Sequence, residues 1–257
     1  MPCSPNGRRP TGSSSPGASP GASPKRPSRR SPGREPVSIV DSSDLRSAVR
    51  ARDWLIPALA LLGFVVLTQQ VLTLGPLTRA DEPVHELITR EHSVVLDVLL
   101  TIVSAVAQFP VSAPILFAYA VFRSVRRSSW APVLTCGLPL LLLSATTLAA
   151  KLLIGRAGTD QTPDTLHVGG TAYPSGHAAT AVVVSTLFVV LLALENRKRA
   201  LAAAGGWSAL VGFARIYVDA HWVSDVAGGL LLGLAIAGTT LVVLRRPTES
   251  DSRSPLL

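Results

Sequence analysis

The amino-acid sequence predicts an all-α, polytopic membrane protein in which six transmembrane helices form a bundle, with one additional interfacial helix. Of the 257 residues, 47% are hydrophobic and only 16% are charged, which is too apolar for an ordinary soluble domain. Several apolar runs are long enough to cross the ~30 Å hydrocarbon core of a bilayer. The net charge of +8 comes without a nucleic-acid-binding motif, so anionic lipids rather than nucleic acid are the expected partners.

Composition divides the chain into three parts. Residues 1–50 are rich in Ser, Pro, Gly and Arg and contain few large apolar residues. Such a segment cannot bury enough surface to fold, so it is predicted to be a disordered, basic cytoplasmic tail. Residues 51–246 form the predicted six-span domain, and residues 247–257 form a second disordered cytoplasmic tail.

The lengths of the apolar runs predict where the chain crosses the membrane, because about 20 helical residues span it. The six spans are predicted at residues 54–74, 104–122, 132–154, 177–194, 200–218 and 222–244. Gly228, Gly229 and Gly233 in the last span are interpreted as positions of close helix packing rather than of ligand binding.

The region between the first two spans is less regular. Residues 77–92 carry many charged side chains, which favours an outer loop with an interfacial helix and places His85 and His92 on the surface. The apolar run at 93–122 would be about 45 Å long as one helix, and Gln-Phe-Pro interrupts it. We therefore predict that residues 94–103 are interfacial, whereas two spans in this run would give seven in total.

Basic residues near the span ends predict the orientation, since Lys and Arg concentrate on the cytoplasmic side. With six spans, four basic clusters fall on one face: Arg46, Arg50 and Arg52; Arg123, Arg126 and Arg127; Arg197, Lys198 and Arg199; Arg245 and Arg246. The sequence therefore predicts a multi-pass protein of the cell membrane with both termini in the cytoplasm. The stretches that lead to His177 and His221 lie on the opposite, extracytoplasmic face.

His221 and His177 lie at the mouths of apolar runs and are the candidate catalytic residues. His221 and Asp225 are four residues apart and share a helix face, so the carboxylate can accept a proton from one imidazole nitrogen and fix the tautomer. The other nitrogen can then act as a nucleophile. Arg215, six residues before His221, offers a planar fork of donors for phosphate oxygens.

The fourth predicted span begins at His177, directly after Ser175 and Gly176. Backbone N–H groups at the start of this helix, together with the Ser175 hydroxyl, favour an anion in front of it. A histidine beside that anion can protonate a leaving oxygen. Lys151, near the outer end of the third span, adds a positive charge at a similar depth, so these residues predict one outer pocket.

The motifs around these residues resemble those of the type 2 phosphatidic acid phosphatase superfamily, in its integral membrane branch. The family is marked by Lys-x6-Arg-Pro, Pro-Ser-Gly-His and Ser-Arg-x5-His-x3-Asp. The second motif is complete at residues 174–177. The third is present as Arg215, His221 and Asp225, with alanine in place of the usual serine.

The first motif departs from the family pattern. Lys151 is present, but Gly158-Thr159 stands where the Arg-Pro pair is expected. Arg156 lies just before that place and is the candidate replacement as a phosphate-binding side chain. Loss of the family arginine would remove roughly 2 to 4 kcal/mol of transition-state stabilisation in a shielded site.

The resemblance implies a membrane phosphatase that hydrolyses a lipid phosphate or diphosphate through a phosphohistidine at the outer face. His221 would be the nucleophile, Asp225 its orienting carboxylate and His177 the acid for the departing oxygen. The phosphate-binding residues would be Lys151, Arg156, Ser175, Gly176 and Arg215. Fixed cations would replace metal ions, so no metal and no cofactor is implied. Phosphatidic acid, phosphatidylglycerol phosphate and polyprenyl diphosphate are the candidate substrates, and the apolar runs carry no signal for an oligomeric state.

Three alternative interpretations fit parts of the sequence. Because Gly158-Thr159 replaces Arg-Pro, the chain could be a catalytically weakened scaffold or transporter that binds lipid phosphates. A haloperoxidase would hold vanadate in place of phosphate, but six spans disfavour it. A zinc site made of His177, His221 and Asp225 would lack a fourth protein ligand.

Overall fold

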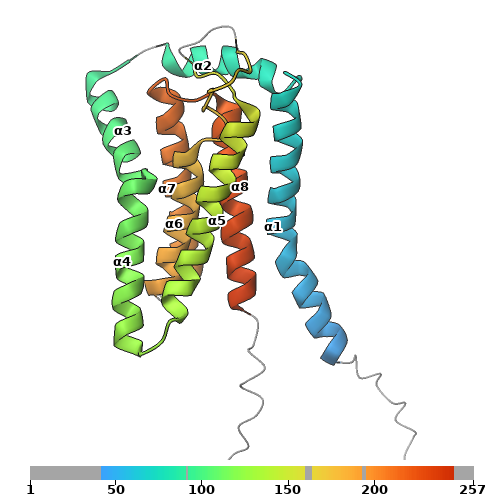
Figure 1. Ribbon diagram of the computed structural model, residues 1–257, viewed down its shortest axis with the longest axis vertical. Helices are drawn as coiled ribbons and strands as arrows, with labels where there is room; N and C mark the ends of the chain where they lie inside the picture. Colours follow the sequence, from blue (N-terminus) through green and yellow to red (C-terminus); the bar gives the residue numbers. More distant parts are fainter. Residues whose placement is uncertain (1–41, 91, 160–163, 193–194, 246–257) are drawn as a thin grey trace, which may run out of the picture. The chain divides into compact units, whose positions relative to one another are not determined.

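The computed structural model describes residues 42–90, 92–159, 164–192 and 195–245. Within these residues the chain is all-helical, with eight α-helices, one short 3-10 helix and no strand, which confirms the predicted class. The elements are α1 (Ser42–Leu72), η1 (Thr78–Ala80), α2 (Asp81–Thr89), α3 (Val94–Ala107), α4 (Phe109–Arg127), α5 (Ala131–Ile154), α6 (Gly176–Leu192), α7 (Arg197–Tyr217) and α8 (Val223–Leu244). Figure 1 shows α2 lying across one end of the long helices.

The composition of the helices marks the chain as a membrane protein. Three helical stretches are long and apolar enough to cross a bilayer, namely residues 51–72 of α1, all of α5 and all of α8. α3 and α4 meet the same criterion together as a bent pair, which gives up to four spans in the described part of the chain. α6 has 17 residues, or about 26 Å of helix, and α7 begins with three basic residues. The count of six spans therefore stays a prediction.

The break between α3 and α4 lies later than predicted. α3 continues to Ala107, α4 begins at Phe109, and the two helices are bent by 48°. Gln108 between them has ψ 140°, and Pro110 has no N–H with which to continue the hydrogen bonds of α3. The boundary predicted at residue 103 was therefore wrong, because the chain leaves the helix only where the proline requires it.

Helix α1 begins earlier than predicted. It starts at Ser42, so residues 42–50 are helical although they were assigned to the disordered tail. This segment contains neither Pro nor Gly, and nothing in it stops the helix of the first span from continuing toward the N-terminus. The remainder of both predicted tails lies outside the described residues.

Glycines of α8 allow the start of α6 to approach it closely. A Cβ on Gly229 would overlap the carbonyl oxygen of Ser175, and one on Gly233 would lie 2.8 Å from the carbonyl oxygen of Ala179. Gly228 is blocked in the same way by an aromatic ring at 2.6 Å. A side chain at Gly229 or Gly233 would push α6 away, so the predicted role in close helix packing is confirmed for these two, whereas Gly228 packs against the loop before α6.

Candidate active site

The loop before α6 presents His177 at the start of that helix. Tyr173 anchors the loop, since its side chain is fully buried and its hydroxyl lies 2.9 Å from Oγ1 of Thr68 on α1. Two residues later, the backbone N–H of Ser175 donates to the carbonyl oxygen of Asp225 over 2.9 Å. The two sequence motifs therefore meet through a direct backbone hydrogen bond.

His221 lies in the short loop between α7 and α8. Asp219 in this loop has a left-handed backbone, with φ 54°, and its Oδ1 lies 2.7 Å from Nε2 of His85 on α2. The His85 ring also packs edge-on against Trp222. Only 8% of His85 is exposed, so its predicted surface position was wrong. It lies beneath the loop and holds the segment that presents His221.

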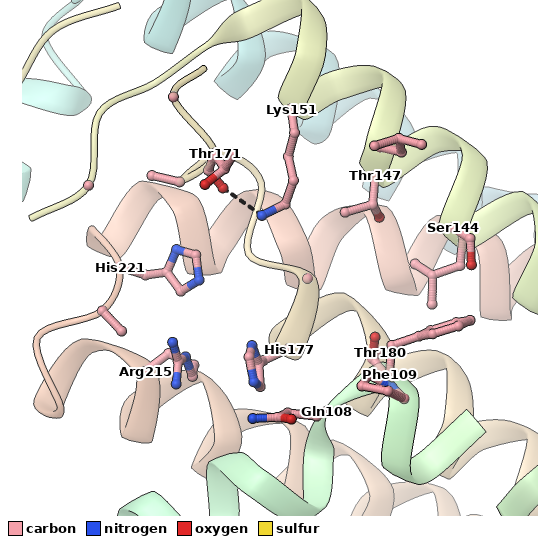
Figure 2. Close-up of a pocket in the computed structure, with 18 of the residues that line it drawn as sticks. Gln108, Phe109, Ser144, Thr147, Lys151, Thr171, His177, Thr180, Arg215 and His221 are labelled. Carbon is pink, nitrogen blue, oxygen red and sulfur yellow. Dashed lines mark hydrogen bonds between the residues drawn. The ribbon is translucent and has the colours of Figure 1, made fainter. Parts of the chain in front are cut away.

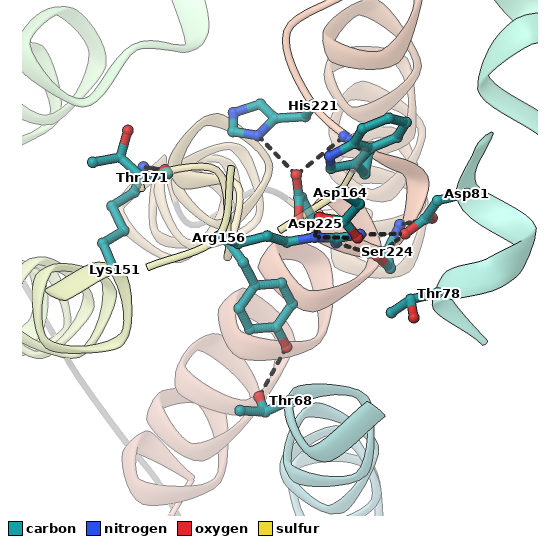
Figure 3. A network of polar contacts seen from close by, with 12 residues as sticks. Thr68, Thr78, Asp81, Lys151, Arg156, Asp164, Thr171, His221, Ser224 and Asp225 are labelled. Atoms are coloured by element: carbon teal, nitrogen blue, oxygen red, sulfur yellow. Dashed lines mark hydrogen bonds and ion pairs between the residues drawn. The ribbon is translucent and has the colours of Figure 1, made fainter. Parts of the chain in front are cut away.

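Asp225, in the first turn of α8, is fully buried behind His221 (Figure 3). Its Oδ2 accepts a hydrogen bond from the backbone N–H of Trp222 at 3.0 Å and lies 3.5 Å from Nδ1 of His221. The second distance is that of an ion pair and exceeds that of an ordinary N–H···O hydrogen bond. Asp225 is thus the carboxylate beside Nδ1 of His221.

A cavity of about 770 Å³ opens in front of these residues. Five of the eight predicted site residues line it, namely Lys151, Gly176, His177, Arg215 and His221. Figure 2 shows the side chains of Lys151, His177, Arg215 and His221 around the same space. Asp225 and Ser175 are fully buried and lie outside this lining. The two histidines predicted to enclose one phosphoryl group thus share one pocket.

Lys151 reaches the pocket from the last turn of α5. Its Nζ donates a hydrogen bond to the carbonyl oxygen of Thr171 at 2.5 Å (Figure 2). Gly158 lines the same pocket. The position at which the family pattern has an arginine is therefore next to the site, which has one cation fewer than that pattern would supply.

Arg156 lies outside the pocket lining, so the structure gives no support to the phosphate-binding role predicted for it. Its side chain is fully buried, and its nitrogens donate to four acceptor side chains: Asp81, Asp164, Ser224 and Asp225. A guanidinium has five N–H groups, and these partners occupy all of them. In this structure no donor of Arg156 is left for a phosphate oxygen, so its replacement of the missing arginine stays a prediction without support.

Burial lowers the pKa of His221. The carboxylate of Asp225 acts in the opposite direction, and the cations Arg215 and Lys151 lower the pKa again. Because the net shift is downward, the His221 imidazole is neutral at neutral pH. The neutral ring is the form that can attack an electrophile.

Several residues of the site were missed in the sequence. Gln108 and Phe109, at the break between α3 and α4, line the pocket together with Thr180 of α6 (Figure 2). The signal for Gln108 was its place in the Gln-Phe-Pro interruption of an apolar run. Asp81, which bonds to Arg156, carries no such local signal, because the two are far apart in the sequence.

A zinc site was one alternative for His177 and His221, and it would need a cluster of ligands. In the part of the chain that the structure describes, no group of three or more His, Cys, Asp or Glu side chains is arranged to hold a metal ion. Among these residues, no cluster of ligands supports the zinc interpretation.

Fold and site together define a helical membrane protein with two histidines, a lysine and an arginine around one pocket. Residues 132–249 match the family model described as the PAP2 superfamily. This matched region is therefore similar to the PAP2 superfamily, and it includes every residue predicted for the site.

Two curated relatives match parts of the chain. Phosphatidylglycerophosphatase B of Bacillus subtilis (strain 168) is 32% identical over 77 residues, which are 28% of this chain and 38% of the relative. Lipid A 1-phosphatase of Porphyromonas gingivalis is 34% identical over 113 residues, which are 43% of this chain and 24% of the relative. The chain thus spans well under half the length of these relatives.

Two solved structures share the fold. A transmembrane PAP2 type phosphatidylglycerolphosphate phosphatase from Bacillus subtilis superposes with a TM-score of 0.62 at 22% identity, covering 76% of this chain and 98% of that one. LpxE from Aquifex aeolicus superposes with a TM-score of 0.50 at 22% identity, covering 63% of this chain and 94% of that one. At this identity the likeness supports the fold alone.

Proposed function

We propose that the protein is a membrane phosphatase that hydrolyses a lipid phosphate or diphosphate through a phosphohistidine intermediate. The observation that carries this proposal is the shared pocket, which His177 and His221 line together with Lys151 and Arg215 (Figure 2). Both curated relatives are lipid phosphatases by name, which agrees with the proposed reaction class.

In the first step, Nε2 of His221 attacks phosphorus and forms a phosphorus–nitrogen bond, while the bond from phosphorus to the lipid oxygen breaks. Asp225 holds the proton on Nδ1 and stabilises the imidazolium that forms. His177 donates a proton to the departing lipid oxygen. The dephosphorylated lipid, or its monophosphate if the substrate is a diphosphate, then leaves the pocket.

In the second step, a water molecule attacks the phosphohistidine. His177, now neutral, accepts a proton from the water, and the phosphorus–nitrogen bond breaks with its electron pair returning to Nε2 of His221. Inorganic phosphate is released and both histidines return to their starting protonation states.

The phosphate oxygens need donors on several sides. Lys151 and Arg215 would supply positive charge without a metal ion, and the Gly176 N–H lies at the start of α6, where backbone donors favour an anion. Oγ of Ser175 and Nε2 of His177 are buried and have no hydrogen-bond partner among the described residues. Both are therefore available to bond to a phosphoryl group.

The topology proposed with this function has six spans and both termini in the cytoplasm. Basic residues end α4 and begin α7, whereas the start of α4 and the end of α7 line the pocket. The pocket and these basic clusters therefore lie at opposite ends of the helices. Since basic residues concentrate on the cytoplasmic side, the pocket would open on the extracytoplasmic side.

The pocket also has an apolar part suited to lipid tails. Phe109, Leu143 and Leu148 line it beside the polar groups, on α4 and α5. A lipid whose tails remain in the bilayer would enter between these helices, with phosphatidic acid, phosphatidylglycerol phosphate and polyprenyl diphosphate as the candidates.

The test is phosphate release by the purified protein in detergent, with EDTA present and phosphatidic acid, phosphatidylglycerol phosphate and a polyprenyl diphosphate as separate substrates. His221→Ala is expected to lower kcat by roughly 10⁴-fold or more, because the nucleophile is lost. His92→Ala, at an exposed position, is the matched control and should keep full activity. Activity that survives His221→Ala would reject the nucleophile assignment.

A second candidate function, lipid-phosphate binding without hydrolysis, is favoured by Gly158 in the pocket lining. Gly158→Arg restores the cation of the family pattern. In an enzyme it should raise kcat/KM about tenfold, since a charge-assisted contact to phosphate is regained. If the protein only binds, Gly158→Arg should tighten binding of the lipid phosphate while no phosphate is released by either protein.

A further inference from the structure

Behind His221, Arg156 joins three segments of the chain through carboxylates (Figure 3). Its Nη2 lies 2.8 Å from Oδ2 of Asp81 on α2 and 2.6 Å from Oδ2 of Asp164 in the loop after α5. Its Nη1 lies 2.7 Å from Oδ1 of Asp225 at the start of α8. The interfacial region, the loop and the last helix therefore meet at one buried guanidinium.

Charge balance explains why an arginine occupies this place. Burial alone would lower the pKa of Arg156, but hydrogen bonds and charges from Asp164, Asp225 and Asp81 raise it above its ordinary value. The side chain therefore stays charged. Without it, Asp81 and Asp225 would be buried near each other with like charges and no cation between them, which disfavours both carboxylates.

Asp81 also bonds directly to the start of α8, in addition to its contact with Arg156. Its Oδ1 accepts a hydrogen bond from the backbone N–H of Ser224 at 2.8 Å, and its Oδ2 accepts another from the Ser224 hydroxyl. These bonds fix the first turn of α8 directly before Asp225. Asp81 thus acts on the orientation of Asp225 both through the backbone and through Arg156.

We infer that Arg156 and Asp81 are positioning residues that hold Asp225 in the orientation and charge state needed to keep the His221 proton on Nδ1. The two oxygens of Asp225 have separate partners: Oδ1 bonds to Arg156, whereas Oδ2 bonds to the Trp222 N–H and faces His221. This inference rests on the proposed function in that His221 is the nucleophile. It gives the interfacial helix α2, which contributes no side chain to the pocket lining, a part in the reaction.

The inference can be separated from a purely structural role through the pKa of His221. The charged and titratable groups that face it directly are Asp225 on α8, Arg215 on α7, Lys151 on α5 and His177 on α6. Those farther back are Arg156, Asp81 and Asp164, with His85 and its partner Asp219 beside the loop. Removing a positive charge from this set raises the pKa of His221, and removing a negative charge lowers it.

The experiment follows the His221 imidazole by NMR in the full-length protein with ¹³C-labelled histidine, while the pH is varied. His221→Ala identifies its signal among the five histidines of the chain. Arg156→Gln should raise the pKa of His221 and Asp81→Asn should lower it, each by about half a pH unit or more. In both variants kcat for phosphate release should fall about tenfold or more, with KM nearly unchanged.

Arg156→Lys tests the geometry separately from the charge. It keeps the positive charge but loses the planar fork that joins the carboxylates. The pKa of His221 should therefore stay close to that of the wild type while kcat falls. Arg90→Gln and Glu86→Gln remove the same charges from exposed positions, and neither should change the pKa or kcat.

Each outcome decides one question. If Arg156→Gln does not fold, Arg156→Lys and Asp81→Asn decide the inference. An unchanged His221 pKa together with an unchanged kcat in folded Asp81→Asn, or a fully active Arg156→Lys, overturns it. Wild-type protein that releases no phosphate overturns the proposed function instead, and the NMR titration then still shows whether Arg156 and Asp81 control the charge state of His221.

Discussion

Asp225 separates two groups of cations that differ in what they can bind. In front of it, Lys151 and Arg215 line an open pocket. Behind it, Arg156 is fully buried and bonded to three carboxylates. All three cations lie in or near the family motifs, yet only the first two have donors to offer to a ligand. The surrounding carboxylates, and not closeness to a motif, therefore decide whether a cation has donors left for a ligand.

Asp225→Asn acts on both sides of this comparison and should have the largest effect. In the proposed mechanism the amide removes the charge that stabilises the His221 imidazolium, and kcat is expected to fall by roughly 10³- to 10⁴-fold. Arg156 loses one charged partner at the same time, so the melting temperature should also fall. Phosphate release and thermal unfolding measure the two effects, with Glu86→Gln at an exposed position as control. Unchanged kcat would remove Asp225 from the mechanism.

Arg215→Gln acts only on the pocket side and should have the next largest effect. The loss of one donor to the transition state is expected to lower kcat/KM by roughly 10²- to 10³-fold. Stability should change little, whereas Arg156→Gln should lower the melting temperature clearly, because it leaves buried carboxylates without a cation. If Arg215→Gln and Arg156→Gln lower the melting temperature equally, the proposed difference between the pocket cations and the buried Arg156 is wrong.

The pH dependence of the wild-type protein gives the smallest effect. In the proposed mechanism His221 must be neutral to attack. Because burial lowers its pKa, the acid limb of kcat/KM should lie below the ordinary histidine pKa of about 6.5. The same shift makes the unfolded state bind more protons than the folded state between the two pKa values. Stability from this group is therefore present above about pH 6.5 and is lost as the pH falls toward the folded-state pKa.

Two measurements check this pH dependence. A pH–rate profile locates the acid limb, and thermal unfolding between pH 5 and 8 follows the linked stability. An acid limb at or above pH 6.5 would mean that the charge of Asp225 raises the pKa of His221 by more than burial lowers it. His221 would then be more solvated than the structure indicates.

Much of the site could be predicted because its residues belong to local motifs. His177 follows Ser175 and Gly176 directly, and His221 and Asp225 share a helix turn, so short-range geometry already relates them. The common pocket also required that Lys151 and Arg215 reach the same end of the helices, which the alternation of spans predicted.

The remaining contacts depend on the tertiary fold. Arg156 meets Asp81 and Asp225 across 75 and 69 positions of the chain, and no local pattern reports such a pairing. His85 was placed on the surface because charged residues surround it in the sequence, whereas its pairing with Asp219 buries it. The helix break at Gln108 had a visible signal in Pro110, but the signal did not give the residue at which α3 ends.

The hydrogen bond from the Ser175 N–H to the Asp225 carbonyl oxygen joins the backbone segment next to His177 to the backbone segment next to His221. When a membrane protein adapts to a thicker or thinner bilayer, its helices tilt and slide. Because this link joins the start of α6 to the start of α8, we expect such adjustments to move the segments of His177 and His221 together. In the proposed reaction, this coupling would keep the distance between the two histidines similar in bilayers of different thickness.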